Sequence, residues 1–229
     1  MSAPNASLVI FDCDGVLVDS ELLSAGILIE EVAAHGVHLT QSYVRDNFLG
    51  RSFPTVAQII RDRFNLVLPS TFEAVYRARL LERFDTDLRT TPGLLDLLPR
   101  LTCSRCVATS SSPPRVARSL AVTGLNQHFS QVFTASLVKA GKPAPDLFLY
   151  AAAAMGVDPA ACLVIEDSRP GIAAAQAAGM QVLLYTGGSH MSGLAFDTTP
   201  PVRAFEAWDM LPDMCPALFA DPIPSKDSA

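Results

Sequence analysis

A short stretch near the start of the chain, residues 8–16 (LVIFDCDGV), constrains the possible folds more than any other. Its first four residues are large and apolar, which is typical of a strand buried on both faces of a parallel sheet. Asp12 and Asp14 follow at once, and Gly15 then allows a turn. An unpaired buried charge is costly, whereas a divalent cation prefers oxygen ligands and would neutralise these acids. We therefore expect a metal site at the tip of this strand, although the two acids could also simply cap the next helix.

The composition of the chain is that of a compact globular protein. Of its 229 residues, 49% are hydrophobic and only 17% are charged, which is enough to build a sizeable core. The net charge of −6 argues against a protein that binds nucleic acid or anionic membranes. No signal peptide or membrane span is expected, and five scattered cysteines suggest a reducing compartment. We therefore expect a cytoplasmic protein that is a monomer or a weak homodimer.

The segment from residue 20 to residue 85 contains the pattern of one helix after another and no convincing strand. Its apolar spacing predicts helices over 21–35, 55–64 and 71–84. Residues 70–73 (STFE) fit a capping box at the start of the third of these. We interpret residues 19–86 as a helical unit inserted after the first strand.

Beyond residue 91 the pattern changes, and short apolar strands alternate with helices. We expect strands at 105–109, 131–134, 161–165 and 182–185, with helices between them. Such alternation predicts a parallel sheet with right-handed crossovers and helices on both faces. The expected fold is therefore α/β: a Rossmann-like doubly wound parallel core. We assign residues 1–18 and 87–229 to this core, with 220–229 as a loose tail, and residues 19–86 to an all-α cap.

Polar residues follow the predicted strands in four separate regions of the chain. They are Asp12 and Asp14, Thr109 and Ser110, Lys142, and Glu166 and Asp167. In an open parallel sheet, the carboxyl ends of the strands form the edge at which ligands bind. Carboxylates for a metal, hydroxyl groups for an anion and a lysine for excess negative charge together favour phosphoryl transfer.

Four segments of the chain resemble the motifs of the haloacid dehalogenase superfamily, in the group with a helical cap after the first motif. These are residues 11–21 (FDCDGVLVDSE), 107–110 (VATS), 142–146 (KPAPD) and 164–168 (VIEDS) with Gly171. The resemblance implies an Mg²⁺-dependent phosphomonoester hydrolase that forms an aspartyl-phosphate. It further implies a small phosphorylated substrate, a sugar phosphate or a sugar-acid phosphate such as 6-phosphogluconate.

The resemblance also implies a role for each matching residue. Asp12 would be the nucleophile, Asp14 would protonate the leaving oxygen and then activate water, and Lys142 would pair with Asp12 and the phosphoryl group. Thr109 would supply the hydroxyl of the second motif, although three consecutive serines leave this assignment open by one position. The phosphate and substrate contacts would be Gly15, Arg51, Ser110 and Ser111. The metal ligands would be Asp12, Asp14 through its backbone carbonyl, Glu166 and Asp167.

Other functions remain open on the sequence. A phosphosugar mutase of the same family would keep these motifs, but the β-phosphoglucomutases carry a histidine where this chain has Ser24. A true dehalogenase normally lacks the second acid of the first motif, and Asp14 is present. A non-catalytic phosphosugar-binding protein would not need the intact pair of acids.

Three further features have simpler interpretations. Arg51, in a loop of the predicted cap, could reach over the site and recognise a substrate carboxylate, or it could be a solvated surface charge. His190 has no acidic or cysteine neighbour at ligand spacing, so we do not expect a site there. Gly187 and Gly188 precede it but lack the Gly-Lys-Ser/Thr pattern of a phosphate loop.

Overall fold

The computed structural model describes residues 6–193 and 200–219, so the expected tail at 220–229 lies outside the described residues. Within this part, six parallel strands form one sheet in the order β3-β2-β1-β4-β5-β6. The strands are β1 (Leu8–Phe11), β2 (Ser104–Thr109), β3 (Val132–Thr134), β4 (Cys162–Glu166), β5 (Gln181–Tyr185) and β6 (Ala204–Phe205). The expected doubly wound α/β class is confirmed.

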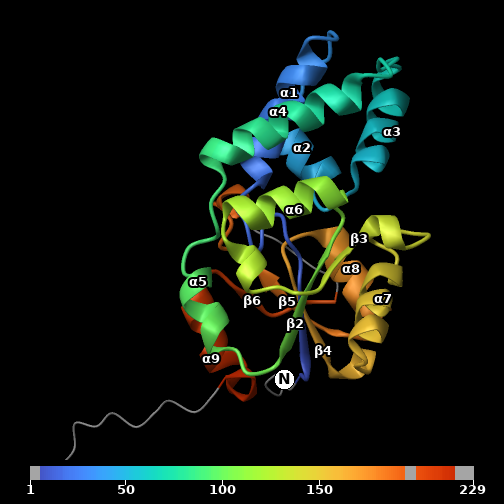
Figure 1. Cartoon of the computed structure of the whole chain (residues 1–229). Helices are drawn as coiled ribbons and strands as arrows, with labels where there is room; N and C mark the ends of the chain where they lie inside the picture. Colours follow the sequence, from blue (N-terminus) through green and yellow to red (C-terminus); the bar gives the residue numbers. More distant parts are fainter. Residues whose placement is uncertain (1–5, 194–199, 220–229) are drawn as a thin grey trace, which may run out of the picture.

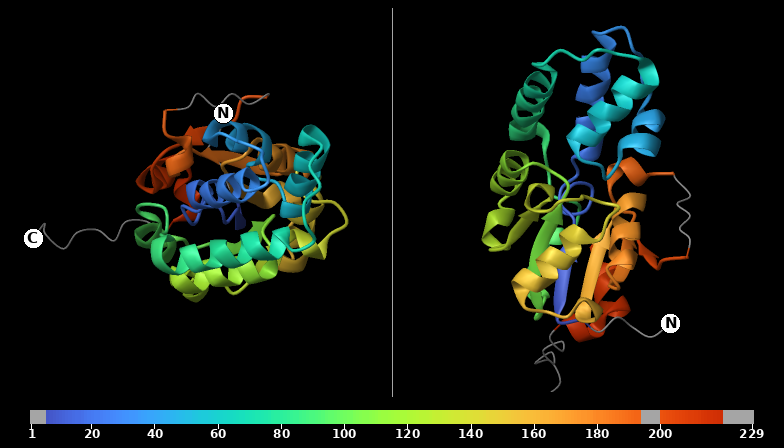
Figure 2. Two further views of the ribbon diagram at one scale, coloured as in Figure 1. Left: turned by 90° about the horizontal axis from the view of Figure 1, so that it is seen from above. Right: turned by 90° about the vertical axis from the view of Figure 1, so that its right-hand side faces the viewer.

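Helices cover both faces of the sheet (Figures 1 and 2). Leu8 and Ile10 of β1 pack in one cluster with α7 (Asp146–Met155) and α8 (Arg169–Ala177). Val9 and Phe11 point to the other face, where they join a cluster that contains residues from three core helices. These helices are α5 (Leu94–Leu97), α6 (Pro113–Val122) and α9 (Leu211–Met214). Because successive strand residues face opposite sides, an all-apolar strand buries both of its faces.

Strand β1 lies in the middle of the sheet, and both of its neighbours are in register with it. Its last residue, Phe11, is paired with Val107 of β2 on one side and with Ile165 of β4 on the other. The chain connections run outward in opposite directions from this point, which makes it a topological switch point. The residues just after β1, β2 and β4 are consequently brought together at one edge.

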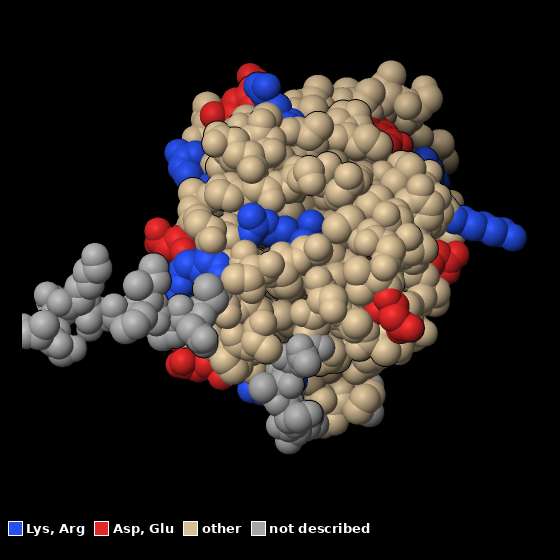
Figure 3. Space-filling model, turned by 60° about the horizontal axis from the view of Figure 1, so that its bottom comes forward, with Lys and Arg blue, Asp and Glu red and all other residues tan. Residues whose placement is uncertain are grey.

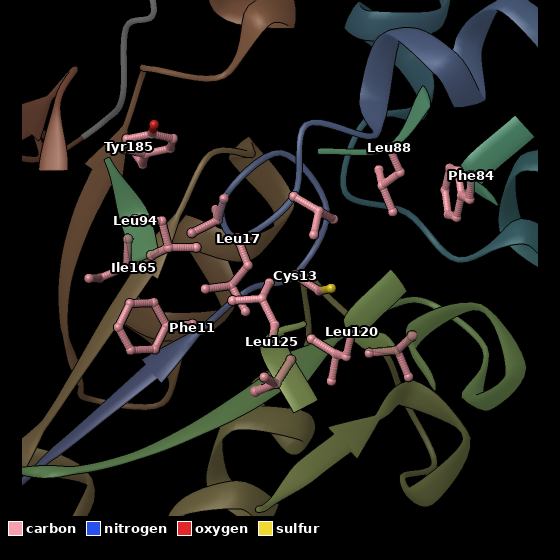
Figure 4. Close-up of a cluster of buried hydrophobic side chains, with 14 of the residues drawn as sticks. Phe11, Cys13, Leu17, Phe84, Leu88, Leu94, Leu120, Leu125, Ile165 and Tyr185 are labelled. Carbon is pink, nitrogen blue, oxygen red and sulfur yellow. The ribbon is translucent and has the colours of Figure 1, made fainter. Parts of the chain in front are cut away.

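Four helices between β1 and β2 lie beyond that edge of the sheet (Figure 1). They are α1 (Glu21–Ala33), α2 (Gln41–Phe48), α3 (Phe53–Phe64) and α4 (Phe72–Asp87). One continuous apolar cluster joins them to the core, and it contains Phe84 and Leu88 as well as Cys13 and Leu120, all labelled in Figure 4. The position of these helices over the strand ends is what encloses a site there.

Short 3₁₀ turns connect the larger elements. They are η1 (Leu98–Arg100), η2 (Leu125–Gln127), η3 (Ala135–Leu137), η4 (Pro159–Ala161), η5 (Ser189–Met191), η6 (Trp208–Met210) and η7 (Pro216–Leu218). Strand β6 and the elements after it were not anticipated, because segments of two to four residues are too short to show a period.

The expected capping box at the start of α4 is wrong. The helix begins at Phe72, and Thr71 at its N-cap makes no side-chain capping bond. Instead of reaching back to the helix start, the Glu73 carboxylate accepts a hydrogen bond from Arg77, one turn further along. An ion pair between Glu73 and Arg77, four residues apart on the helix, has formed in place of the capping hydrogen bond.

In the part of the chain that the structure describes, no helix is both long and apolar enough to cross a bilayer. Figure 3 shows one face of the molecule, on which acidic and basic side chains are dispersed among uncharged residues.

Candidate active site

Three buried carboxylates meet where β1 and β4 end. Asp12 follows β1 directly, Glu166 is the last residue of β4, and Asp167 comes next. One oxygen of each lies within 4.8 Å of the others. They meet because the two strands are adjacent and in register, as the strand pattern predicted.

The Lys142 ammonium joins this cluster from the loop after β3. Its Nζ lies 2.8 Å from Asp12 Oδ1 and 2.6 Å from Glu166 Oε1, and it also donates to the Ala108 carbonyl. Its side chain is 1% exposed and packs over the Phe148 ring. Burial acts to lower the pKa of Lys142, but the two carboxylates outweigh burial and raise it, so the lysine is a permanent cation.

One ammonium does not balance three buried carboxylates. Burial, with the neighbouring carboxylates, raises the pKa of Asp12 and of Asp167 well above their usual range, against the lowering effect of Lys142. Asp167 Oδ2 is buried and makes no hydrogen bond among the described residues; its close polar neighbour is His190 Nε2, 2.8 Å away. A donor set made of carboxylate oxygens with excess negative charge fits a hard divalent cation such as Mg²⁺.

Glu166 is the most constrained of the three acids. Its Oε2 accepts from the backbone N–H groups of Asp167 and Ser168 and from the Ser168 hydroxyl, all at 2.9 Å, while Oε1 accepts from Lys142. A Cβ at Gly171 would lie 1.7 Å from Oε1, so the first turn of α8 must have a glycine there. Glu166 therefore fixes Lys142 and the turn into α8, and it adds negative charge to the cluster.

Asp14 lies in a different environment from Asp12. Its Oδ1 accepts hydrogen bonds of 2.6 Å from Ser20 Oγ and Arg115 Nη2, and its Oδ2 accepts from Ser111 Oγ. Burial alone would raise the pKa of Asp14, but Arg115 and the two hydroxyl groups lower it. The two acids of the first motif thus have pKa values displaced in opposite directions, because Asp14 has a cation and two hydroxyl donors whereas Asp12 lies buried among other carboxylates.

Arg115 is a site residue that sequence reasoning missed. It lies in the first turn of α6, six residues after Thr109, the last residue of β2. Its Nη2 also donates to Ser24 Oγ at 2.8 Å, so it links the core to α1. Proximity to the serine run was the one available signal, and it does not identify the acid that Arg115 contacts.

The hydroxyl groups after β2 point in different directions. Thr109 is buried at the strand end and accepts from the backbone N–H of Ser111. Ser110 donates instead to the Gly50 carbonyl in the loop between α2 and α3. Thr109 and Ser110 are therefore held differently, the first at the sheet edge and the second against the loop between α2 and α3.

A cavity of about 230 Å³ lies between this edge and the helices above it. The sheet edge contributes Asp12, Asp14, Thr109, Ser110 and Ser111, whereas Lys142, Glu166 and Asp167 are not on its wall. The other side contributes an acid, a phenol, two aromatic rings and three guanidinium groups: Glu21, Tyr76, Phe48, Phe53, Arg45, Arg51 and Arg77. Of the predicted substrate contacts, Arg51 is on the wall, and Gly15 is not.

Arg77 and Arg51 differ in how they are held, and Glu21 is distinguished by its pKa. Arg77 is anchored by Glu73 and by Ser112, whereas Arg51 is exposed and makes no ion pair within the described residues. Burial, with the nearby Asp14 charge, raises the pKa of Glu21 to about 8.

His190 has an acidic neighbour in space that the sequence did not reveal. Its Nε2 lies 2.8 Å from Asp167 Oδ2, although no acid stands near it in the sequence. The contact is made because η5, after β5, folds back against the loop that follows β1. A local search for ligand spacing cannot find a pair separated by a helix and a strand.

The comparisons with known proteins agree with this arrangement. The family model described as haloacid dehalogenase-like hydrolase matches residues 6–179, which include every motif quoted above. The chain belongs to the haloacid dehalogenase-like hydrolases. The expected family and the expectation of an enzyme are confirmed.

Several relatives span most of the chain. It is 28% identical over 208 residues to the 6-phosphogluconate phosphatase of Escherichia coli, with 90% of this chain and 93% of the relative covered. It is 30% identical over 192 residues to hexitol phosphatase B of the same species, with 80% and 86% covered. A hydrolase of this family from Deinococcus radiodurans, solved with bound phosphate and sodium, is 29% identical with a TM-score of 0.72, and 96% of this chain and 100% of that one are covered. This haloacid dehalogenase-like hydrolase therefore resembles sugar phosphatases over nearly its whole length.

Proposed function

We propose that the protein is an Mg²⁺-dependent phosphomonoester hydrolase acting on a small sugar phosphate or sugar-acid phosphate such as 6-phosphogluconate. The observation that carries this proposal is the pair Asp12 and Asp14. Asp12 belongs to the carboxylate cluster, whereas Asp14 is held two residues away by Arg115, Ser20 and Ser111. Both acids reach the same cavity.

In the proposed mechanism, Asp12 attacks phosphorus and forms an aspartyl-phosphate while the bond to the leaving oxygen breaks. Asp14 gives a proton to that oxygen, then takes one from the water that hydrolyses the aspartyl-phosphate, which releases inorganic phosphate and regenerates Asp12. Lys142 stabilises charge on the phosphoryl oxygens, and the Thr109 hydroxyl and Ser110 amide donate to them.

Magnesium would be held by Asp12, Asp167 and the backbone carbonyl of Asp14. Glu166 belongs to the same cluster, but its oxygens already accept several hydrogen bonds, so it would act through its charge. When bound, the ion supplies positive charge that screens the nucleophile from the phosphate and stabilises charge in the transition state.

We further propose that residues 19–86 form a cap and that residues 1–18 and 87–229 form the core. The chain leaves and re-enters the core at one place: Asp19 N–H bonds to the Arg89 carbonyl, and Thr91 N–H bonds to the Leu17 carbonyl. Closure of such a cap would exclude water from the cavity.

The cap side of the cavity supports an anionic or hydroxyl-rich leaving group. Arg45, Arg51 and Arg77 line it, and an arginine fork suits a carboxylate. Glu21 lies on the same wall and can pair with a sugar hydroxyl. The names of the two Escherichia coli relatives fit this chemistry.

The test is phosphate release from a panel of phosphorylated metabolites by wild type and Asp12→Asn, with and without Mg²⁺. We expect sugar or sugar-acid phosphates to rank above nucleotides, activity to require the ion, and Asp12→Asn to fold but remain at background. A nucleotide as best substrate would overturn the substrate class, and full turnover by Asp12→Asn would overturn the nucleophile.

The same panel separates the alternative activities. Interconversion of sugar-phosphate isomers without phosphate release would identify a mutase. Binding of sugar phosphates without turnover by the folded, Mg²⁺-saturated protein would identify a binding protein.

A further inference from the structure

His190 lies against the carboxylate cluster but has no part in the mechanism above. It is buried within η5, and its side chain is 3% exposed. The ring nitrogen Nε2 is 2.8 Å from Asp167 Oδ2, and the Asp167 side chain is 1% exposed. Neither ring nitrogen makes a hydrogen bond within residues 6–193 and 200–219, and Asp167 Oδ2 makes none either. A buried imidazole with this one close polar neighbour calls for an explanation.

The surrounding backbone leaves room for this ring. A Cβ at Gly15 would lie 2.8 Å from His190 Cε1, and a Cβ at Gly188 would lie 2.7 Å from the same atom. Both separations are shorter than side-chain contacts allow, so glycine at each position makes the space that the imidazole fills. The Gly187–Gly188 pair, which is no phosphate loop, thus contributes to seating His190.

The turn that carries His190 is also held in place. The backbone N–H and the hydroxyl of Ser189 both donate to Asp19 Oδ1, at 3.1 and 2.8 Å. Asp19 lies where the chain leaves the core. The ring is therefore fixed from both sides, by η5 and by the turn at Gly15.

We propose that His190 is the positioning residue of Asp167: Nε2, 2.8 Å from one oxygen of this carboxylate, holds that oxygen in place while the other serves the metal ion. This inference rests on the proposed Mg²⁺-dependent function. Carboxylates that bind metals are commonly oriented by a second hydrogen-bond partner, and loss of that partner typically weakens metal affinity by about 10–100-fold. His190 does not touch the substrate in this proposal.

The test measures Mg²⁺ binding directly, by isothermal titration calorimetry of the full chain without substrate. We expect His190→Leu to weaken Mg²⁺ binding by about 10–100-fold. His190→Gln, which keeps an N–H donor at similar reach, should restore most of the affinity. In hydrolysis assays, the Mg²⁺ concentration that gives half-maximal activity should rise by a similar factor.

A double-mutant comparison separates positioning from general damage. In an Asp167→Asn background, His190→Leu should change the residual Mg²⁺ affinity little, because the carboxylate it would orient is absent. If the leucine variant does not fold, His190→Asn, whose amide is too short to reach Oδ2, replaces it.

Three results would overturn the inference, and they distinguish the role of His190 from the proposed metal dependence. Wild-type affinity in a folded His190→Leu protein, or an equal loss in the Asp167→Asn background, overturns the role of His190 alone. A wild-type protein that binds no Mg²⁺ overturns the proposed metal dependence, and the role of His190 with it.

Discussion

Replacing Lys142 with methionine tests whether this lysine holds the carboxylate cluster together. The change keeps the length of the side chain and removes its charge. The Lys142 ammonium lies 2.8 Å from Asp12 and 2.6 Å from Glu166 in a site that is almost fully buried. Removing one partner from a buried ion pair costs about 3–5 kcal/mol, because the remaining charge is left uncompensated.

The stability loss can be converted into a melting temperature. For a chain of this size, 1 kcal/mol changes Tm by about 2–4 °C, so Lys142→Met should lower Tm by roughly 6–20 °C in metal-free buffer. Mg²⁺ should then raise the Tm of the variant more than that of wild type, because the cation supplies charge to the same carboxylates. Phosphatase activity should fall by about 10²–10³ and should not recover with Mg²⁺.

Thermal unfolding with and without Mg²⁺, monitored by circular dichroism, measures both effects. Lys139→Met is the matched control: it removes the same charge three residues away, at an exposed position, and should leave Tm and activity near wild type. An unchanged Tm for Lys142→Met, or the same Mg²⁺ increment in both proteins, would refute the reasoning.

Three further predictions follow from the cavity and its supports. Arg51→Gln should raise the KM for a sugar-acid phosphate more than for the matching neutral polyol phosphate; equal effects would remove Arg51 from anion recognition. Glu21→Gln should stabilise the protein by about 1–2 kcal/mol at pH 9 and little at pH 4. The folded-state pKa of Glu21 is raised to about 8, above the usual value of 4.5, so ionisation of Glu21 lowers the free energy of unfolding as the pH rises. A difference in urea unfolding between variant and wild type that does not change with pH would contradict this. Gly171→Ala should cost about 1–3 kcal/mol and reduce activity, because its methyl group displaces Glu166; a wild-type Tm would show that the turn adapts.

Much of the core could be predicted because short stretches of the sequence are enough to indicate its strands and helices. The strands at β1, β2, β4 and β5 are apolar runs that bury both faces, and helix periodicity located α1, α4, α6 and α7. The ends of the elements were less predictable, and a two-residue strand such as β6 leaves no periodic signal. The capping box at Ser70–Glu73 failed because Glu73 pairs with Arg77 instead.

The sequence by itself determined which groups gather at the sheet edge. Adjacent parallel strands end at one edge, so Asp12, Thr109 and Asp167 had to lie near one another once the strands were placed. The positions of the strands along the chain were sufficient for this prediction, because the ends of adjacent parallel strands lie side by side in the sheet.

Only the tertiary structure decided what surrounds these groups. Arg115 contacts Asp14 across 101 positions, and Lys142 contacts Asp12 across 130. His190 meets Asp167 because η5 folds back over Gly15, and Glu21 reaches the cavity because α1 begins at its wall. Such contacts depend on how helices and turns pack in three dimensions, and packing between distant segments leaves no spacing pattern in the chain. The strand that Asp12 and Asp14 follow therefore predicted the site, whereas the fold determined the ionisation and orientation of these two acids.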